Sequence, residues 1–562
     1  MQFKQTLVRL FVIFFPLTGL AQTTYLPQGD KANILIERLE IKGRTDSILN
    51  FSKIKSYSRK QAINGVNDYI QRFGKNSLSK TDEYNLQSLY MNNLEWLAPA
   101  EQALYKSKKP ILNNFYTTPA SLYEVHIKDF DLAVNPVIQF VMAKEKNSSE
   151  NLFLNTRGLT LRGRIANKIG FYTYLTDNQE RDPEYVRQWV SERKAVPGQG
   201  LYKNFKGTGY DYFDARGYFT FNVTKYVDVS FGYDKNFIGN GYRSMFLSDF
   251  GNNNLFLRLN TRIWKLNYQN LFMELHSAAI PGSGDRLVPK KYAAMHHLDM
   301  AFTKWLNVGL FEGVIFGRTE HFEFGYLNPI IFYRSIEQQN GSFDNSVAGL
   351  DYKINLPKRI QLYGQLLIDE FLLSEIKANR GWWANKWGIQ IGAKFIDIFG
   401  IKNLDLQVEH NRVRPFTYSH FDSVGNYTHY NQPMAHPLMA NFKEFTGIAR
   451  YQPAPKWPAA SKIIYYRQGR DSSSQSFGSN IFLPNGTPYR IGDFGYEIGS
   501  GWKTNVLYAS FLLSYEFRDN FFVEVHGVYR KQETKTPPLT STNTSIISLG
   551  VRWNMQRREF DY

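Results

Sequence analysis

Most of the chain beyond residue 136 alternates between apolar and polar side chains with a period of two, which predicts β-strands that have two different faces. Val227 and Phe231, for example, share a row that alternates with Asp228 and Ser230. Similar alternation runs over residues 360–369, 387–395, 509–517, 521–529 and 547–553. These segments reach about ten residues and keep one face apolar and aromatic, which suits a tilted strand that crosses a membrane. A soluble β-sandwich would have shorter strands and a polar outer face.

The length of this alternating region indicates a closed barrel. Backbone groups in hydrocarbon must be hydrogen-bonded within the protein, so a membrane sheet has to close on itself. We therefore predict an all-β transmembrane fold, a large antiparallel outer-membrane β-barrel of about 16–18 strands over residues 131–562. The chain ends at residues 559–562 with an aromatic sequence, Glu-Phe-Asp-Tyr, of the kind that such barrels carry for assembly.

Residues 22–130 follow a different pattern, with apolar positions at helical spacing. Two amphipathic helices are predicted, over 58–73 and 80–97. Ser79 opens the second helix, Asp82 lies in its first turn, and Pro99 follows its end. Residues 32–41 are compatible with a short strand. We interpret this region as a small periplasmic helical region or a plug.

The first 21 residues have the features of a secretory signal. Lys4 and Arg9 precede an apolar run over 10–16, and small residues then lead to expected cleavage before Gln22. Downstream there is no uninterrupted apolar stretch of the ~20 residues that a membrane helix needs. Export without such a helix is consistent with a place in the outer membrane.

Composition narrows the chemistry further. Aromatic residues make up 16% of the chain, and the mean hydropathy is −0.41, so apolar residues must be interleaved with polar ones. The absence of cysteine excludes disulfides, thiolate metal sites and a Cys nucleophile. The net charge of +17 becomes +15 when Lys4 and Arg9 leave with the signal, which suits anionic headgroups or acidic glycans. No nucleic-acid-binding motif accompanies the charge, so nucleic acid is not an expected partner.

Two segments contain candidate ligand-binding residues. In residues 237–249, glycines allow a tight turn that brings Tyr242, Arg243 and Asp249 near each other. The alternative is a structural turn in which Arg243 pairs with lumen carboxylates. Trp382 and Trp383 follow Arg380 and Gly381, and their rings together with nearby cations suit a sugar that carries an acidic group. An aromatic girdle at the membrane interface is the alternative for this pair.

No catalytic or metal site is expected. The histidines of 296–299 and 321–323 do not offer three local ligands, so ordinary polar lumen residues are favoured over a metal site. Asp369 and Glu370 are adjacent and point to opposite faces of a strand, so they do not form a glycosidase pair without a residue from another strand. No nucleophile elbow is present either. We predict a protein that is not an enzyme and has no cofactor.

Several motifs together resemble the Wzi-type capsule-assembly barrels. They are residues 237–249, 327–329, 344–351 and 362–371. Residues 26–30, 436–438 and 441–445 resemble more narrowly the RemB group of gliding-motility proteins. The resemblance implies an outer-membrane barrel with an N-terminal helical region, which acts as a lectin-like anchor for surface polysaccharide or supports motility. It implies no catalytic residue.

These observations lead to one functional hypothesis and one alternative. We expect a non-enzymatic barrel whose extracellular loops bind or organise surface polysaccharide, or support adhesion and gliding motility. Its expected partners are outer-membrane lipid, surface polysaccharide and components of motility or secretion machinery. The alternative is a channel for anionic solutes, in which Arg243 and Lys394 select the anion.

Overall fold

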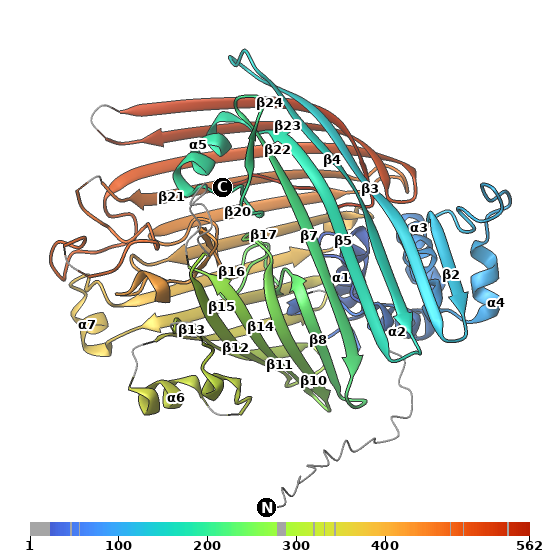
Figure 1. Ribbon diagram of the computed structural model, residues 1–562, viewed down its shortest axis with the longest axis horizontal. Helices are drawn as coiled ribbons and strands as arrows, with labels where there is room; N and C mark the ends of the chain where they lie inside the picture. The colour runs from blue at the N-terminus through green and yellow to red at the C-terminus, as the bar shows by residue number, and fades with distance from the viewer. Residues whose placement is uncertain are drawn as a thin grey trace, which may run out of the picture.

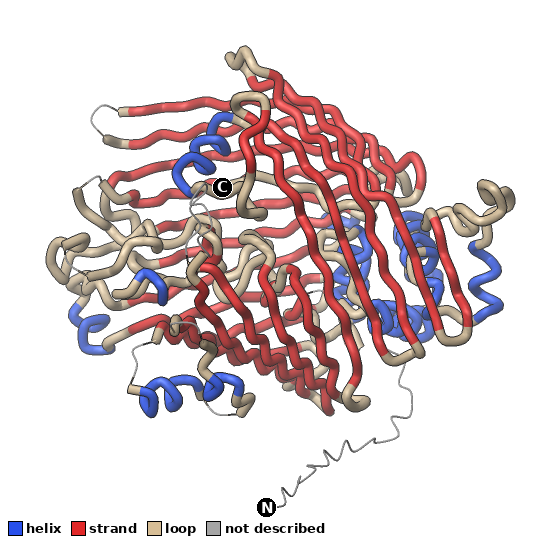
Figure 2. Tube along the Cα trace, viewed as in Figure 1, coloured by secondary structure: helices blue, strands red, loops and turns tan. Residues whose placement is uncertain are grey.

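The computed structural model describes residues 23–44, 48–55, 57–277, 288–318, 321–330, 332–341, 344–472, 474–486, 488–536 and 539–562 (Figure 1). The predicted signal, residues 1–21, lies outside the described residues. The described chain forms a β-barrel with helices at one end and long loops at the other (Figure 2).

Eighteen antiparallel strands form the closed wall, at the upper end of the predicted range. They are β3 (Phe130–Glu145), β4 (Asn151–Ile165), β5 (Ile169–Arg181), β7 (Gly209–Asn222), β8 (Val227–Asp234), β10 (Asn254–Ile263), β11 (Leu266–His276), β12 (Lys290–Ala301), β13 (Leu306–Phe316), β14 (Asn345–Leu356), β15 (Ile360–Glu370), β16 (Lys386–Phe395), β17 (Leu404–Val413), β20 (Phe442–Tyr451), β21 (Ala459–Arg470), β22 (Trp502–Arg518), β23 (Phe521–Thr534) and β24 (Thr540–Trp553). The last strand pairs with the first, from Ile546 opposite Glu145 to Trp553 opposite Ile138. This seam closes the cylinder.

Six shorter strands accompany the wall in the described residues. β2 (Tyr123–Ile127) pairs with the start of β3, and β6 (Lys203–Phe205) pairs with β7. Two small sheets are separate from the wall: β1 (Ile54–Lys55) with β9 (Phe237–Ile238), and β18 (Thr428–His429) with β19 (Gln432–Pro433).

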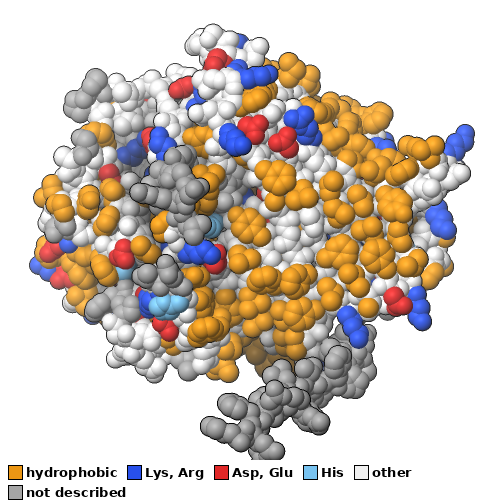
Figure 3. Space-filling view, in the orientation of Figure 1, with side chains coloured by type: hydrophobic (Ala, Val, Ile, Leu, Met, Phe, Trp, Pro, Cys, Tyr) orange, Lys and Arg blue, Asp and Glu red, His pale blue; other side chains and the backbone are white. Residues whose placement is uncertain are grey.

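The two faces of the wall differ as the alternation predicted. Gln361, Gln365 and Gln390 are buried inside the barrel, whereas Leu310 and Ile391 point outward and are more than half exposed. Hydrophobic side chains spread over the outer surface of the strands (Figure 3). A closed wall with this apolar outer face satisfies the backbone and matches hydrocarbon, so the chain resides in the outer membrane.

The two ends of the barrel are distinguishable. At one end the connections are short, such as residues 264–265 and 519–520, and at the other they are long, such as 414–441 and 471–501. Exposed aromatic side chains mark the short-turn end, as expected for an interfacial girdle; they include Tyr226, Trp264, Phe302, Trp305, Phe399, Trp457 and Phe517. Since outer-membrane barrels have short periplasmic turns, the long loops face the cell exterior.

The N-terminal residues form helices at the short-turn end: α1 (Lys31–Gly43), α2 (Arg59–Phe73), α3 (Lys80–Met91) and α4 (Pro99–Gln102), with short 3-10 turns η1 (Lys75–Ser77), η2 (Leu94–Trp96) and η3 (Ala103–Tyr105). Both predicted helices are present, but the second continues after Met91 only as η2. Ser79 and Asp82 form a reciprocal capping box at its start. None of the helices in the described residues is long and apolar enough to span a bilayer.

The predicted short strand over 32–41 is wrong, because these residues belong to α1. The Asp30 side chain accepts a hydrogen bond from the Ala32 N–H at 2.8 Å and caps the helix. Leu35 and Leu39 are buried at helical spacing against α2 and α3. Packing against the other helices therefore decides the structure of a segment whose local pattern was ambiguous.

The helical region also enters the barrel. Lys53 Nζ lies 3.0 Å from Asp299 and also pairs with Asp351, both on the inner face of the wall. Lys353 pairs with Glu40 of α1, and Ile54 is opposite Ile238 in the small β1–β9 sheet. The helices therefore close the periplasmic end and reach into the lumen (Figure 1).

Candidate functional site

Two long loops, residues 235–253 and 414–441, fold inward and fill the lumen with a packed core. The ring of Phe246 stacks on Phe311 of β13 with 4.4 Å between centroids. The Tyr427 hydroxyl donates to the Phe246 carbonyl at 2.6 Å, and the Tyr418 hydroxyl donates to the Met245 carbonyl at 2.8 Å. The lumen is thus an ordered interior in which the loops support each other.

Tyr242 and Arg243 lie in this core, facing carboxylates. Their backbone N–H groups donate to Glu409 at 2.7 and 3.1 Å. The Arg243 guanidinium lies 3.1 Å from Asp561 and 3.6 Å from Glu444, and its side chain is almost fully buried. This is the pairing with lumen carboxylates that a structural role for Arg243 requires.

The last nine residues, 554–562, which we call the tail, run through the lumen. Asn554 donates to the Pro136 carbonyl at 3.0 Å near the periplasmic end. Tyr562 packs 5.9 Å from Trp189 in α5 (Glu184–Arg193), a helix in an external loop. The C-terminus accordingly lies beside α5 in Figure 1. The final strand β24 ends at Trp553, so the aromatic terminus lies beyond the wall in the tail, which turns inward.

Charge holds the tail in place. Lys462 Nζ pairs with both Glu559 and Asp561, and Arg558 pairs with Glu180 at 2.7 Å. Burial alone would raise the pKa of the Asp561 carboxyl, but the charges of Arg243 and Lys462 hold that pKa well below its usual range. The tail carboxylates therefore pair with cations of the lumen.

Asp249, the third residue of the predicted set, is not part of this cluster. Its side chain is exposed, and its backbone carbonyl accepts a hydrogen bond from Lys235 Nζ at 3.1 Å. Tyr242 and Arg243 therefore lie together, and Asp249 lies at the other end of the segment.

The tryptophan pair lies in a cluster of external loops. Trp382 and Trp383 have ring centroids 6.4 Å apart, and the second ring packs edge-on against Phe416 at 5.9 Å. The Arg490 guanidinium lies 4.1 Å from the centre of the Trp383 ring, within range of a cation–π interaction. Both tryptophans are half-buried. The pair belongs to the external mouth and not to the periplasmic girdle.

Three loops are held together around this pair. The Arg414 guanidinium donates to the carbonyls of Asn385, Trp382 and Tyr496 at 2.7, 3.2 and 2.9 Å. Its burial lowers the pKa of Arg414 from the usual value. Gly381 has φ of +70°, and a Cβ there would lie 2.8 Å from the backbone nitrogen of Tyr496. Glycine is therefore required where segments 380–383 and 493–496 approach each other.

Exposed apolar and cationic groups surround the tryptophans. The Arg380 guanidinium lies 4.3 Å from the centre of the Phe494 ring, and about half of its side chain is exposed. Large apolar side chains nearby on these loops are exposed: Phe371, Leu372, Leu373, Ile376, Phe421, Tyr489, Ile491 and Phe494. We call Arg380, Trp382, Trp383, Arg490 and Phe494 the aromatic–arginine face. Sequence reasoning missed Arg490 and Phe494, although aromatic and basic residues alternate with glycines over 489–496.

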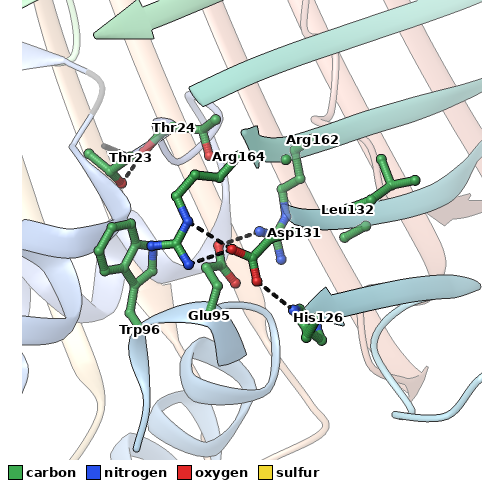
Figure 4. A pocket seen from close by; sticks show the side chains of 11 residues that line it. Thr23, Thr24, Glu95, Trp96, His126, Asp131, Leu132, Arg162 and Arg164 are labelled. Carbon is green, nitrogen blue, oxygen red and sulfur yellow. Dashed lines mark hydrogen bonds and ion pairs between the residues drawn. The ribbon is translucent and has the colours of Figure 1, made fainter. Parts of the chain in front are cut away.

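A small cavity lies where the helices meet the wall (Figure 4). Its charged groups pair with one another: Arg164 Nε donates to Asp131 at 2.7 Å, His126 Nδ1 lies 3.0 Å from the same carboxylate, and Arg162 pairs with Glu95. The Arg162–Glu95 pair joins η2 to the wall, so the cavity lies at the junction between the helices and the barrel.

No group of three or more metal-ligating side chains occurs among the described residues. His297 is instead paired with Asp351 at 2.7 Å, and Asp299 pairs with Lys53. In the resembling motif 436–445, His436 Nε2 lies 2.9 Å from Glu444 inside the lumen. These polar groups are part of the packed interior.

Comparison with solved structures identifies the type of barrel. Wzi of Escherichia coli, described as a carbohydrate-binding β-barrel of the outer membrane involved in group 1 capsule assembly, aligns with a TM-score of 0.57 and 12% identity over 96% of this chain and 100% of Wzi. This chain has the Wzi-type barrel fold. OprD of Pseudomonas aeruginosa aligns over 76% of this chain and 96% of its own, with 11% identity and a TM-score of 0.42. No family model and no curated protein matches the sequence.

Proposed function

We propose that the protein is a non-enzymatic outer-membrane barrel that binds or organises surface polysaccharide through its aromatic–arginine face. The observation that carries this proposal is the position of Arg380, Trp382 and Phe494 on the external loops, partly exposed, with the loops joined by the hydrogen bonds of Arg414. Aromatic rings stack on the apolar faces of sugars, and a guanidinium pairs bidentately with a carboxylate. The favoured ligand is thus a polysaccharide that contains acidic sugars.

The filled lumen favours this proposal over a channel for anions. Arg243 and Lys394, which an anion channel would use, are buried and engaged: Arg243 by Asp561, and Lys394 by Glu37 and the Asn240 carbonyl. The Wzi-type fold supports a binding role further, because Wzi itself is a carbohydrate-binding barrel. The resemblance of residues 26–30 and 441–445 to the RemB group extends the proposal to adhesion or gliding through the same external loops.

The test is titration of the purified protein in nanodiscs with the polysaccharide of its own cell surface. Trp382→Ala and Arg380→Gln should each weaken binding about ten-fold, which corresponds to ~1.4 kcal/mol. Trp264→Ala, which removes an exposed tryptophan at the periplasmic end, is the matched control and should bind normally. Equal affinities of all four proteins, or no binding by the wild type, would contradict the proposal. A deletion strain scored for capsule retention and for spreading on agar separates polysaccharide attachment from motility.

A further inference from the structure

Three polar side chains lie on the outer, lipid-facing surface of the wall. Asn270 of β11 is opposite His296 of β12, which is opposite Glu312 of β13. His297, the next residue in β12, points into the lumen toward Asp351, so His296 points outward. His296 Nε2 and Asn270 Oδ1 have no hydrogen-bond partner in the part of the chain that the structure describes. Such groups are costly in hydrocarbon unless protein covers them.

A segment of the loop between β13 and β14 covers this polar row. We call residues 321–330 and 332–341 the strap; it contains η4 (Phe324–Leu327) and α6 (Tyr333–Asn340). The Tyr333 ring lies 4.1 Å from the His296 ring. The Glu337 carboxylate accepts a hydrogen bond from the Ser346 hydroxyl at 2.9 Å. Figure 1 shows α6 outside the wall, beside the strands β12 and β13.

The strap descends along the wall instead of staying at the external mouth. It follows β13, which ends at Phe316 on the long-loop side. The Tyr268 hydroxyl nevertheless donates to the carbonyl of Pro329 in the strap. Tyr268 is only three residues beyond Lys265 in the periplasmic turn, and β11 has 11 residues. The strap therefore extends beyond the midpoint of β11, and β11 is just long enough to cross the membrane.

The outer side of the strap is apolar where it lies deepest. Ile330 and Phe332, which adjoin Pro329 in the sequence, are 85% and 76% exposed, more than the lipid-facing Leu310 of β13 at 55%. Phe324 is 79% exposed and lies nearer the mouth, because its ring is 6.3 Å from Phe322, which packs on Phe316. Exposed polar residues, Gln338 to Asn340, come later, where the chain returns to the mouth at Asn345. Arg334 is also exposed, but it pairs with Glu337 at 2.7 Å, and its long side chain can extend toward headgroups.

We propose that the strap is embedded in the membrane and that Phe324, Ile330 and Phe332 contact the acyl chains of outer-membrane lipid. The strap continues the lipid-facing surface of the wall over the polar row, with Tyr333 and Glu337 turned inward. Lipid is the occupant that fits, because the strap packs on the same outer face on which Leu310 and Leu350 are exposed. This inference is independent of polysaccharide binding.

The absence of cysteine makes a direct test possible, because a single introduced cysteine is a unique site for a nitroxide spin label. Phe332→Cys and Ile330→Cys are spin-labelled in lipid vesicles. The collision rate of each label with oxygen, which concentrates in hydrocarbon, is compared with its collision rate with a water-soluble nickel chelate. Leu310→Cys is the lipid control, and Phe421→Cys on an exposed external loop is the aqueous control.

We expect both strap labels to match the lipid control. The ratio of oxygen collisions to nickel collisions should be several-fold higher at the strap than at the aqueous control. A strap label that collides with nickel like residue 421 would overturn the proposal. Protection from both reagents would also overturn it, because it would show that protein, such as a second copy of this chain, covers the strap. Heat-modified migration on gels verifies that each variant is folded.

Discussion

The guanidinium of Arg243 lies 3.1 Å from the carboxylate of Asp561, although 318 residues separate them in the sequence. One residue belongs to a loop that enters the barrel from the exterior, and the other belongs to a tail that enters from the periplasmic end. Their pairing therefore connects the inward-folded loop to the tail inside the lumen. Four predictions follow from this arrangement and from the contacts around it.

Replacement of Arg243 by methionine should release the tail. The change leaves Asp561 and Glu444 without their buried partner, which costs about 3–5 kcal/mol in comparable cases. We expect trypsin to cleave after Arg557 and Arg558 in the variant and to spare both in the wild type. Arg157→Met, which breaks an exposed pair with Asp177, should change stability by about 0–1 kcal/mol and leave the tail protected. An equally protected tail in both variants would contradict this role of Arg243.

Acid should loosen the helical region from the barrel. Burial alone would raise the pKa of Asp82, but Arg38 and Lys42 lower it to about 2 from 3.8. Since the folded pKa is the lower one, this stabilisation, about 2 kcal/mol, is present above pH 4 and disappears as pH falls from 4 to 2. Arg38 also pairs with Asp397 of the barrel at 2.9 Å, so the effect extends to docking.

Hydrogen exchange of α1 and α3 between pH 2 and 5 measures this effect. Asp82→Asn should exchange faster than the wild type at pH 5, and the difference should vanish near pH 2. Asp68→Asn, at a partly exposed pair with Arg72, is the control and should exchange like the wild type throughout. A difference between Asp82→Asn and wild type that is independent of pH would refute the electrostatic explanation.

Planar bilayers should show no large, steady conductance with the wild-type protein. The helical region, the loops and the tail place buried groups such as Lys53, Tyr418 and Asp561 across the lumen. Stable openings of porin size would show that the interior moves aside and would restore the channel hypothesis. A porin inserted in the same membrane serves as the positive control.

Alanine at Gly381 should damage the aromatic–arginine face without unfolding the barrel. The added Cβ meets the Tyr496 backbone, and a positive φ costs a residue with a side chain about 1–2 kcal/mol. We expect weaker polysaccharide binding and unchanged heat-modified migration on gels. Gly400→Ala has a similar φ of +77° but open space around the Cβ, so it separates backbone strain from collision. Normal binding by Gly381→Ala would show that the contact is dispensable.

The sequence predicted the wall well because strand periodicity is local. Rows such as that of Val227 and Phe231 report which side faces lipid wherever the chain crosses the membrane, and the number of such rows sets the size of the barrel. The capping residues Ser58 and Ser79 likewise mark their helices from within a few positions. The prediction for residues 32–41 was wrong because contacts with helices distant in the sequence decide their structure.

The interior was harder to predict, because its contacts join residues that are far apart in sequence. Nothing local to Arg243 indicates that its partner is Asp561 and not another of the 50 acidic residues. The packing of Trp383 beneath Arg490 similarly depends on how three loops meet. The strap did leave a signal: Asn270, His296 and Glu312 interrupt the lipid-facing rows of three neighbouring strands.

The position of the tail constrains the order of assembly. Residues 554–562 lie inside a cylinder whose final seam joins β24 to β3, and the helices occupy its periplasmic opening. The tail must enter the lumen before β24 pairs with β3, or pass the folded helices afterwards. In the first route, the tail is already in place when the last strands close around it.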